Sequence, residues 1–192
     1  MSSYLLSELI DEQIKKIEKI ILLHQVDKTD AIETKKITPD KFLLLYCSKE
    51  MTVLRQISQT DLSHSLFQIL HRPSDIMKNL KEVKFDEINR ICVYYIIAAN
   101  CLQCPNKHEE SSTQSSMILD LLIQQSNFVF SPNEHIYSSF LQHNFAILLS
   151  SIASFSLSTY KRVFSTMINE FKTGKIQQAT LKLCMFMSSK MS

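Results

Sequence analysis

Three residues able to bind a soft metal ion lie close together near the middle of the 192-residue chain. Cys101, Cys104 and His108 form a Cys-x2-Cys-x3-His cluster, and thiolate and imidazole groups are common zinc ligands. A structural zinc site takes four ligands, so the fourth would come from elsewhere in the fold or from a partner chain. Free cysteine is also among the most often buried residue types, which instead places Cys101 in the core, Cys104 at a helix end and His108 in solvent. We favour this second interpretation and expect no bound cofactor, with zinc as the alternative.

The scarcity of glycine excludes several classes of enzyme. The chain has a single glycine, where average usage would give about 13. Phosphate-binding loops and dinucleotide turns need glycines because backbone amides must approach the phosphates, and a nucleophile elbow has no room for a nearby Cβ. The six histidines show no His-Glu-x-x-His or other paired metal spacing. We therefore expect a non-enzymatic protein, with an enzyme of dispersed catalytic residues as a third alternative.

Charged residues are nearly absent from the second half of the chain up to Tyr160. No Lys or Arg occurs between Lys107 and Lys161, and residues 111–160 carry only Asp120 and Glu134 as charges. Because a solvated helix face normally carries Lys and Glu, helices in this segment must either be surrounded by other helices or meet a partner.

We assign the partner-facing side to a predicted helix over residues 131–155, which has apolar and neutral polar sides and contains no Lys or Arg. The residues chosen as the partner-binding surface are Tyr137, Phe140, Leu141, His143 and Ile147. The leading hypothesis is therefore a helical interaction domain, a subunit or adaptor that binds partner segments in an apolar groove between helices. A homodimer or a hetero-complex would satisfy it equally.

The C-terminal segment suggests a different partner. From Leu157 onward it carries one acidic residue and six basic residues. The basic residues include Lys161, Arg162, Lys172, Lys175 and Lys182. A basic helical pair can follow the phosphates of a nucleic acid, so a nucleic-acid-associated subunit is the alternative function. The aromatic residues of the segment have the spacing of a buried helix side, which favours an ordinary solvated basic face.

Apolar periodicity, capping residues and prolines predict the helices that position these groups. The predicted helices cover residues 3–26, 39–57, 61–72, 74–80, 86–104, a segment from 117, 131–155, 158–173 and 175–187. Loops are expected over residues 27–37 and over the polar stretch 105–116. Pro73 is expected to end one helix and Ser74 to cap the next.

These elements predict an all-α fold, because no period-two alternation or hairpin turn signal occurs. We expect one domain over residues 1–192, a compact bundle of about eight or nine helices, with an irregular array of helix pairs as second choice. No uninterrupted run of 18 apolar residues and no signal-peptide pattern occurs, and the five cysteines are unevenly spaced. This favours an intracellular protein, nuclear or cytoplasmic, with free thiols and no membrane partner.

Overall fold

The computed structural model describes residues 3–26, 39–80, 84–103, 112–130, 137–155, 161–165 and 168–169. Its helices are α1 (Ser3–Val26), α2 (Pro39–Tyr46), α3 (Ser48–Ser58), α4 (Leu62–Asn79), α5 (Phe85–Leu102), α6 (Ser112–Val129) and α7 (Ser138–Phe155). A further helical turn covers residues 161–165. These described residues contain no strand, and the predicted all-α helical bundle is confirmed.

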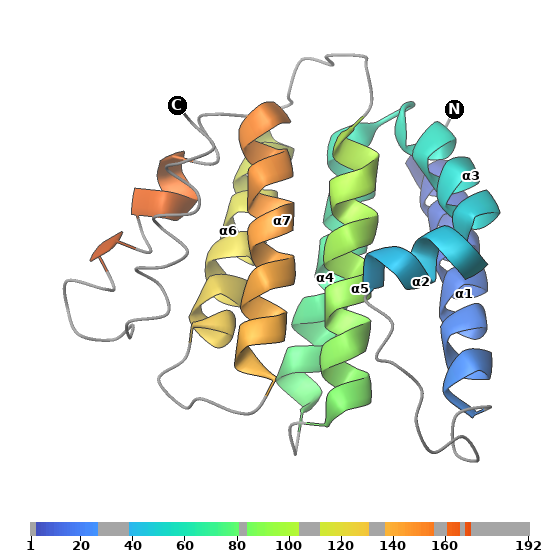
Figure 1. Cartoon of the computed structure of the whole chain (residues 1–192). Helices are drawn as coiled ribbons and strands as arrows, with labels where there is room; N and C mark the ends of the chain where they lie inside the picture. The colour runs from blue at the N-terminus through green and yellow to red at the C-terminus, as the bar shows by residue number, and fades with distance from the viewer. Residues whose placement is uncertain are drawn as a thin grey trace.

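The helices form two layers. α1, α4 and α6 lie in one layer and α3, α5 and α7 in the other, so the chain stacks three pairs of helices side by side (Figure 1). The short α2 lies across the outside of this array and contacts α3 and α5 (Figure 1). The bundle therefore also shares the stacking of helix pairs that characterises the alternative architecture, an irregular array of helix pairs.

The first helix has the bounds and the buried side that its periodicity predicts. Its inward stripe packs on α3 and α4, and no member is more than 4% exposed; the members are Leu6, Ile10, Ile14, Ile17 and Ile21. Spacings of three and four residues place these side chains on one face. The opposite face carries charged residues and is exposed.

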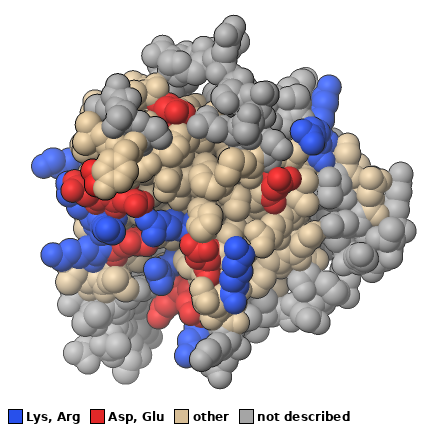
Figure 2. All heavy atoms as spheres, turned by 180° about the vertical axis from the view of Figure 1, so that it is seen from behind, with Lys and Arg blue, Asp and Glu red and all other residues tan. Residues whose placement is uncertain are grey.

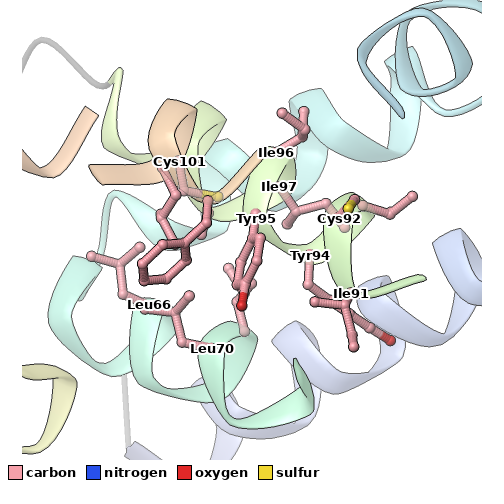
Figure 3. Close-up of a cluster of buried hydrophobic side chains, with 14 of the residues drawn as sticks. Leu66, Leu70, Ile91, Cys92, Tyr94, Tyr95, Ile96, Ile97 and Cys101 are labelled. Carbon is pink, nitrogen blue, oxygen red and sulfur yellow. The ribbon is translucent and has the colours of Figure 1, made fainter. Parts of the chain in front are cut away.

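The core is organised around α5, which is buried on nearly all sides from Ile91 to Leu102. It contacts α2, α3, α4 and α7. Its largest buried side chain, Tyr95, extends towards Leu70 of α4, as Figure 3 shows, and its ring lies 5.2 Å from that of Phe145 on α7. A helix that is hydrophobic all round must be surrounded by others, and here it is.

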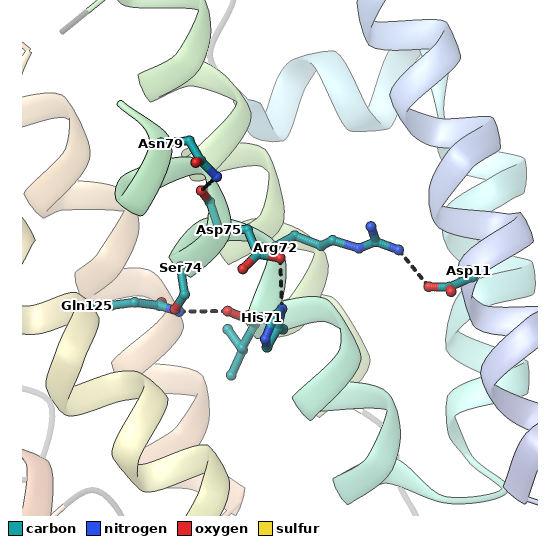
Figure 4. A network of polar contacts seen from close by, with 8 residues as sticks. Asp11, His71, Arg72, Ser74, Asp75, Asn79 and Gln125 are labelled. Atoms are coloured by element: carbon teal, nitrogen blue, oxygen red, sulfur yellow. Dashed lines mark hydrogen bonds and ion pairs between the residues drawn. The ribbon is translucent and has the colours of Figure 1, made fainter. Parts of the chain in front are cut away.

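The prediction of two short helices around Pro73 is wrong, because α4 continues through the proline. Asp61 caps the helix by accepting the N–H of His64 at 2.9 Å, and Pro73 and Ser74 are buried within it. The proline removes one backbone donor, but Gln125 reaches across from α6 to the same turn (Figure 4). Its Nε2 donates to the Leu70 carbonyl at 2.6 Å and to the Ser74 hydroxyl at 2.9 Å.

The predicted helix over residues 39–57 is present but bends at Cys47. The Cys47 N–H still donates to the Leu43 carbonyl at 3.0 Å, and the Cys47 carbonyl accepts from Met51 at 2.8 Å. Its ψ of 13° departs from the helical value, so α2 and α3 point in different directions. This bend allows α2 to cross the array.

The remaining boundaries differ from expectation in two places. Helix α6 begins at Ser112, so residues 112–116 of the predicted 105–116 loop are helical. Helix α7 begins at Ser138, and the Ser131 start signal lies outside the described residues. The predicted loop over 27–37, the last predicted helix over 175–187 and most of the one over 158–173 also lie outside them.

We predict that Gln125→Leu lowers the free energy of unfolding by about 1–2 kcal/mol, because it leaves the buried Leu70 carbonyl and Ser74 hydroxyl without their donor. The loss stays in this range because the Gln125 Oε1 itself has no partner among the described residues. Urea unfolding measures it. Gln124→Leu, at an exposed neighbouring position, is the control, and an equal loss in both variants would contradict the assignment.

Two adjacent tyrosines give opposite predictions. The Tyr94 hydroxyl donates to Glu18 of α1, whereas the buried Tyr95 hydroxyl has no partner among the described residues. Tyr94→Phe should therefore lower the free energy of unfolding by about 1 kcal/mol, and Tyr95→Phe should leave it unchanged or raise it. Thermal and urea unfolding of the two variants make the comparison, and a larger loss for Tyr95→Phe would refute it.

Candidate partner-binding groove

A groove of about 440 Å³ opens where α2 crosses α5, with α3 and α7 completing its walls. Its lining residues are Leu43, Leu44, Ser48, Met51, Thr52, Arg55, Ile96, Ala99, Asn100, Gln103 and Ile147. Six of them are apolar and five are polar or charged. With its volume of about 440 Å³, the groove is large enough for several side chains of a ligand.

The bend at Cys47 and the small side chain of Ala99 create this space. Because α2 turns away from α3, Leu43 faces the core while Leu44 stands at the rim with 72% of its surface exposed. On the facing helix, Ala98 and Ala99 are both methyl-sized side chains, and Ala99 lines the groove. A short residue below a crossing helix leaves the floor of the groove open.

Among the described residues that line the groove, Arg55 is the one that carries a charge. It is half-buried, and its guanidinium makes no hydrogen bond or ion pair with any described residue. The neighbouring polar side chains are engaged with their own helices: Thr52 donates to the Ser48 carbonyl at 2.8 Å and Asn100 to the Ile96 carbonyl at 3.4 Å. Among the described residues, the groove therefore offers an apolar floor and one guanidinium without a partner.

The described lining residues include the Arg55 guanidinium, and they include no His, Asp, Glu or Cys. Arginine stays protonated at physiological pH and forms bidentate hydrogen bonds with carboxylates and phosphates. The groove can hold a ligand and orient its acidic group.

The five residues predicted to face a partner do not form one surface in the structure. Leu141 is fully buried, so it belongs to the core and is not available to a partner. Tyr137 and Phe140 are half-buried against Phe85, with ring centroids 5.4 Å and 6.0 Å from it. His143 is exposed outside the groove, and Ile147 alone of the five lines it.

The same burial explains the lack of charge in α7. Leu141, Phe145, Leu148, Leu149 and Ile152 are each at most 3% exposed within a single chain. A helix enclosed by its own fold needs no charged face, so charge depletion there does not require a partner.

The groove residues on α2 and α3 escaped sequence reasoning, although one signal points to them. Residues 42–46 form an unbroken apolar run within a helix, and such a run cannot face one side only. Leu44, Leu45 and Tyr46 are accordingly exposed. The sequence carried no comparable signal for Arg55, whose place depends on how α3 packs.

The other predicted sites fall partly outside the described residues. Cys101 is buried and accepts a hydrogen bond from the Ser58 hydroxyl at 3.6 Å. Cys104 and His108 are not described, and the described residues alone contain no group of three metal-ligating side chains. Zinc binding stays a prediction.

The basic segment is described only at its start. Lys161 and Arg162 are exposed, while Lys172, Lys175 and Lys182 lie outside the described residues. Nucleic-acid binding through this segment also stays a prediction.

Comparison with known proteins does not assign the chain to a family. Neither protein-family models nor curated proteins nor solved structures show a significant match to it. Across the described residues, no helix combines the length and apolar character that crossing a bilayer requires.

The buried thiol of Cys47, next to the groove residue Ser48, is expected to make the protein less stable at alkaline pH. Burial, with a smaller effect of Glu50, raises the pKa of Cys47 from 9.0 to about 11. The unfolded thiol therefore ionises first, and stability that is complete below pH 9 falls as the pH rises to about 11, by at most about 1.4 kcal/mol per pH unit.

Urea unfolding across this pH range should show the fall, with a shallower slope in Cys47→Ala. The other buried thiols are common to both proteins, so the difference in slope isolates Cys47. Parallel slopes would contradict the prediction.

Proposed function

We propose that the protein is a binding module, a subunit or adaptor of an intracellular complex rather than an enzyme. Its groove between α2, α3, α5 and α7 takes a short amphipathic helix that carries a carboxylate. The observation that carries this proposal is Arg55, which lies beside an apolar floor and has no partner among the described residues.

The apolar part of the groove suits helical anchors. A bound helix presents side chains at positions i, i+3 or i+4 and i+7 on one face, and a space of about 440 Å³ accommodates a few of them. Beside it, α2 exposes Leu45 (56%) and Tyr46 (40%) as well as the rim residue Leu44. These side chains extend the apolar contact surface beyond the groove itself.

The polar part of the groove favours an acidic partner. A half-buried guanidinium is costly to leave unpaired when a ligand covers it, so the ligand must supply an acceptor. A carboxylate provides two oxygens that match the guanidinium fork. A single cation is too little for a nucleic acid, whose binding usually rests on several phosphate contacts.

A displayed library of amphipathic helices, randomised on one face, tests the proposal. Selection on the full chain should enrich sequences with apolar residues at helical spacing and one Asp or Glu. Synthesised winners should lose at least about tenfold in affinity on Arg55→Glu, because one charge-assisted pair becomes a repulsion. Fluorescence anisotropy measures the affinities.

Two neighbouring leucines supply the control. Leu44→Glu alters the groove and should weaken binding, whereas Leu45→Glu alters an exposed residue that does not line the groove and should weaken it less. Both changes are at exposed positions, so the fold should tolerate them. Failure to enrich any helix, or equal binding by wild type, Arg55→Glu and Leu44→Glu, would reject the groove as the binding site.

A further inference from the structure

The outward face of α1 carries a regular stripe of exposed residues. The α1 stripe consists of Leu5, Glu8, Glu12, Lys15, Lys19 and Leu22, all exposed. The spacings along it are three, four, three, four and three residues, which is the heptad pattern of a coiled-coil seam. The other side of α1 packs on α3 and α4, and all six side chains of the stripe face away from that packing.

The stripe is ordered by chemical type. Its two acidic residues lie in the N-terminal half of α1, its two basic residues in the C-terminal half, and a leucine stands at each end. The helix ends add two further exposed apolar side chains, Tyr4 at 74% and Leu23 at 60%. Figure 2 shows charged side chains of both signs gathered on the side of the molecule where α1 lies.

This order is self-complementary when two copies of α1 run antiparallel. With a two-fold axis between residues 13 and 14, facing residues have numbers that add to 27. Leu5 then faces Leu22, Glu8 faces Lys19 and Glu12 faces Lys15, each contact occurring twice. The flanking Tyr4 faces Leu23 in the same register.

A parallel pair in register would instead oppose each charge to its own copy, which is repulsive. Charge order therefore selects the antiparallel arrangement. A helix of 24 residues is about 36 Å long, so the leucine contacts at its ends are well separated and fix the register.

The four charged residues of the stripe are available for such contacts. Glu8, Glu12, Lys15 and Lys19 make no ion pair or side-chain hydrogen bond with any described residue. The acidic residues of α1 that face the bundle are engaged: Asp11 pairs with Arg72 at 2.6 Å (Figure 4), and Glu18 accepts from Tyr94. The ion pair and hydrogen bond within the bundle thus use acidic residues of α1 that lie outside the stripe.

We infer that a second copy of this chain covers the α1 stripe, forming an antiparallel homodimer held by two leucine contacts and four ion pairs. The inference is independent of the groove, which lies on α2, α3, α5 and α7.

Complementary charge reversals test the inference. Light scattering after size exclusion should give twice the 22.2 kDa chain mass for the wild type. Glu8→Lys with Glu12→Lys makes the stripe wholly basic, and Lys15→Glu with Lys19→Glu makes it wholly acidic. Each double variant should weaken dimerisation at least about tenfold, because every ion pair becomes a repulsion.

An equimolar mixture of the two double variants should restore the dimer as a heterodimer, which a merely structural effect of the substitutions would not do. Asp86→Lys with Asp120→Lys, at exposed positions on α5 and α6, is the charge-matched control and should dimerise like the wild type. Circular dichroism checks that every variant is folded. A monomeric wild type, a dimer indifferent to the reversals, or a mixture that stays monomeric would each overturn the inference.

Discussion

The whole structure depends on the need to bury α5 on every side. From Ile91 to Leu102 this helix has no polar face that could be left to solvent, and every residue of this range except the partly exposed Asn100 is buried. Helices α3 and α7 flank it within its own layer, α4 packs on it from the other layer, and α2 crosses its outer side. The two-layer arrangement of the bundle follows from this single requirement, because one helix cannot be enclosed by its neighbours in one plane.

The groove arises where that enclosure is incomplete. Its outer cover is α2, an eight-residue helix that crosses α5 instead of running along it. Beneath the crossing, Ala99 is too short to fill the space, and Arg55 enters from α3 without a partner among the described residues. The groove thus lies at a place where the cover of this core helix is incomplete, and its described lining combines apolar side chains with the Arg55 guanidinium.

The sequence predicted features that depend on residues within one helix, such as its buried side. It did not predict features that depend on contacts with another helix. The stripe from Leu6 to Ile21 predicted both the helix α1 and its buried side, because periodicity is a local property. Pro73 was misread because α4 buries it and Gln125, 52 residues later, contacts the same turn through the Leu70 carbonyl and the Ser74 hydroxyl. The role of α7 was ambiguous for the same reason: charge depletion is compatible with a core helix and with an interface, and only packing distinguishes them.

The length of α2 has a consequence for the dynamics of the groove. Eight residues are too few for a stable helix in water, so α2 owes its helical form to its contacts with α3 and α5. Among the α2 side chains that the structure describes, only Leu43 and the first residue, Pro39, are buried. Amide hydrogens of α2 should therefore exchange with solvent through local opening, long before the helices around α5 unfold, and the groove wall would form and dissolve without disturbing the rest of the fold.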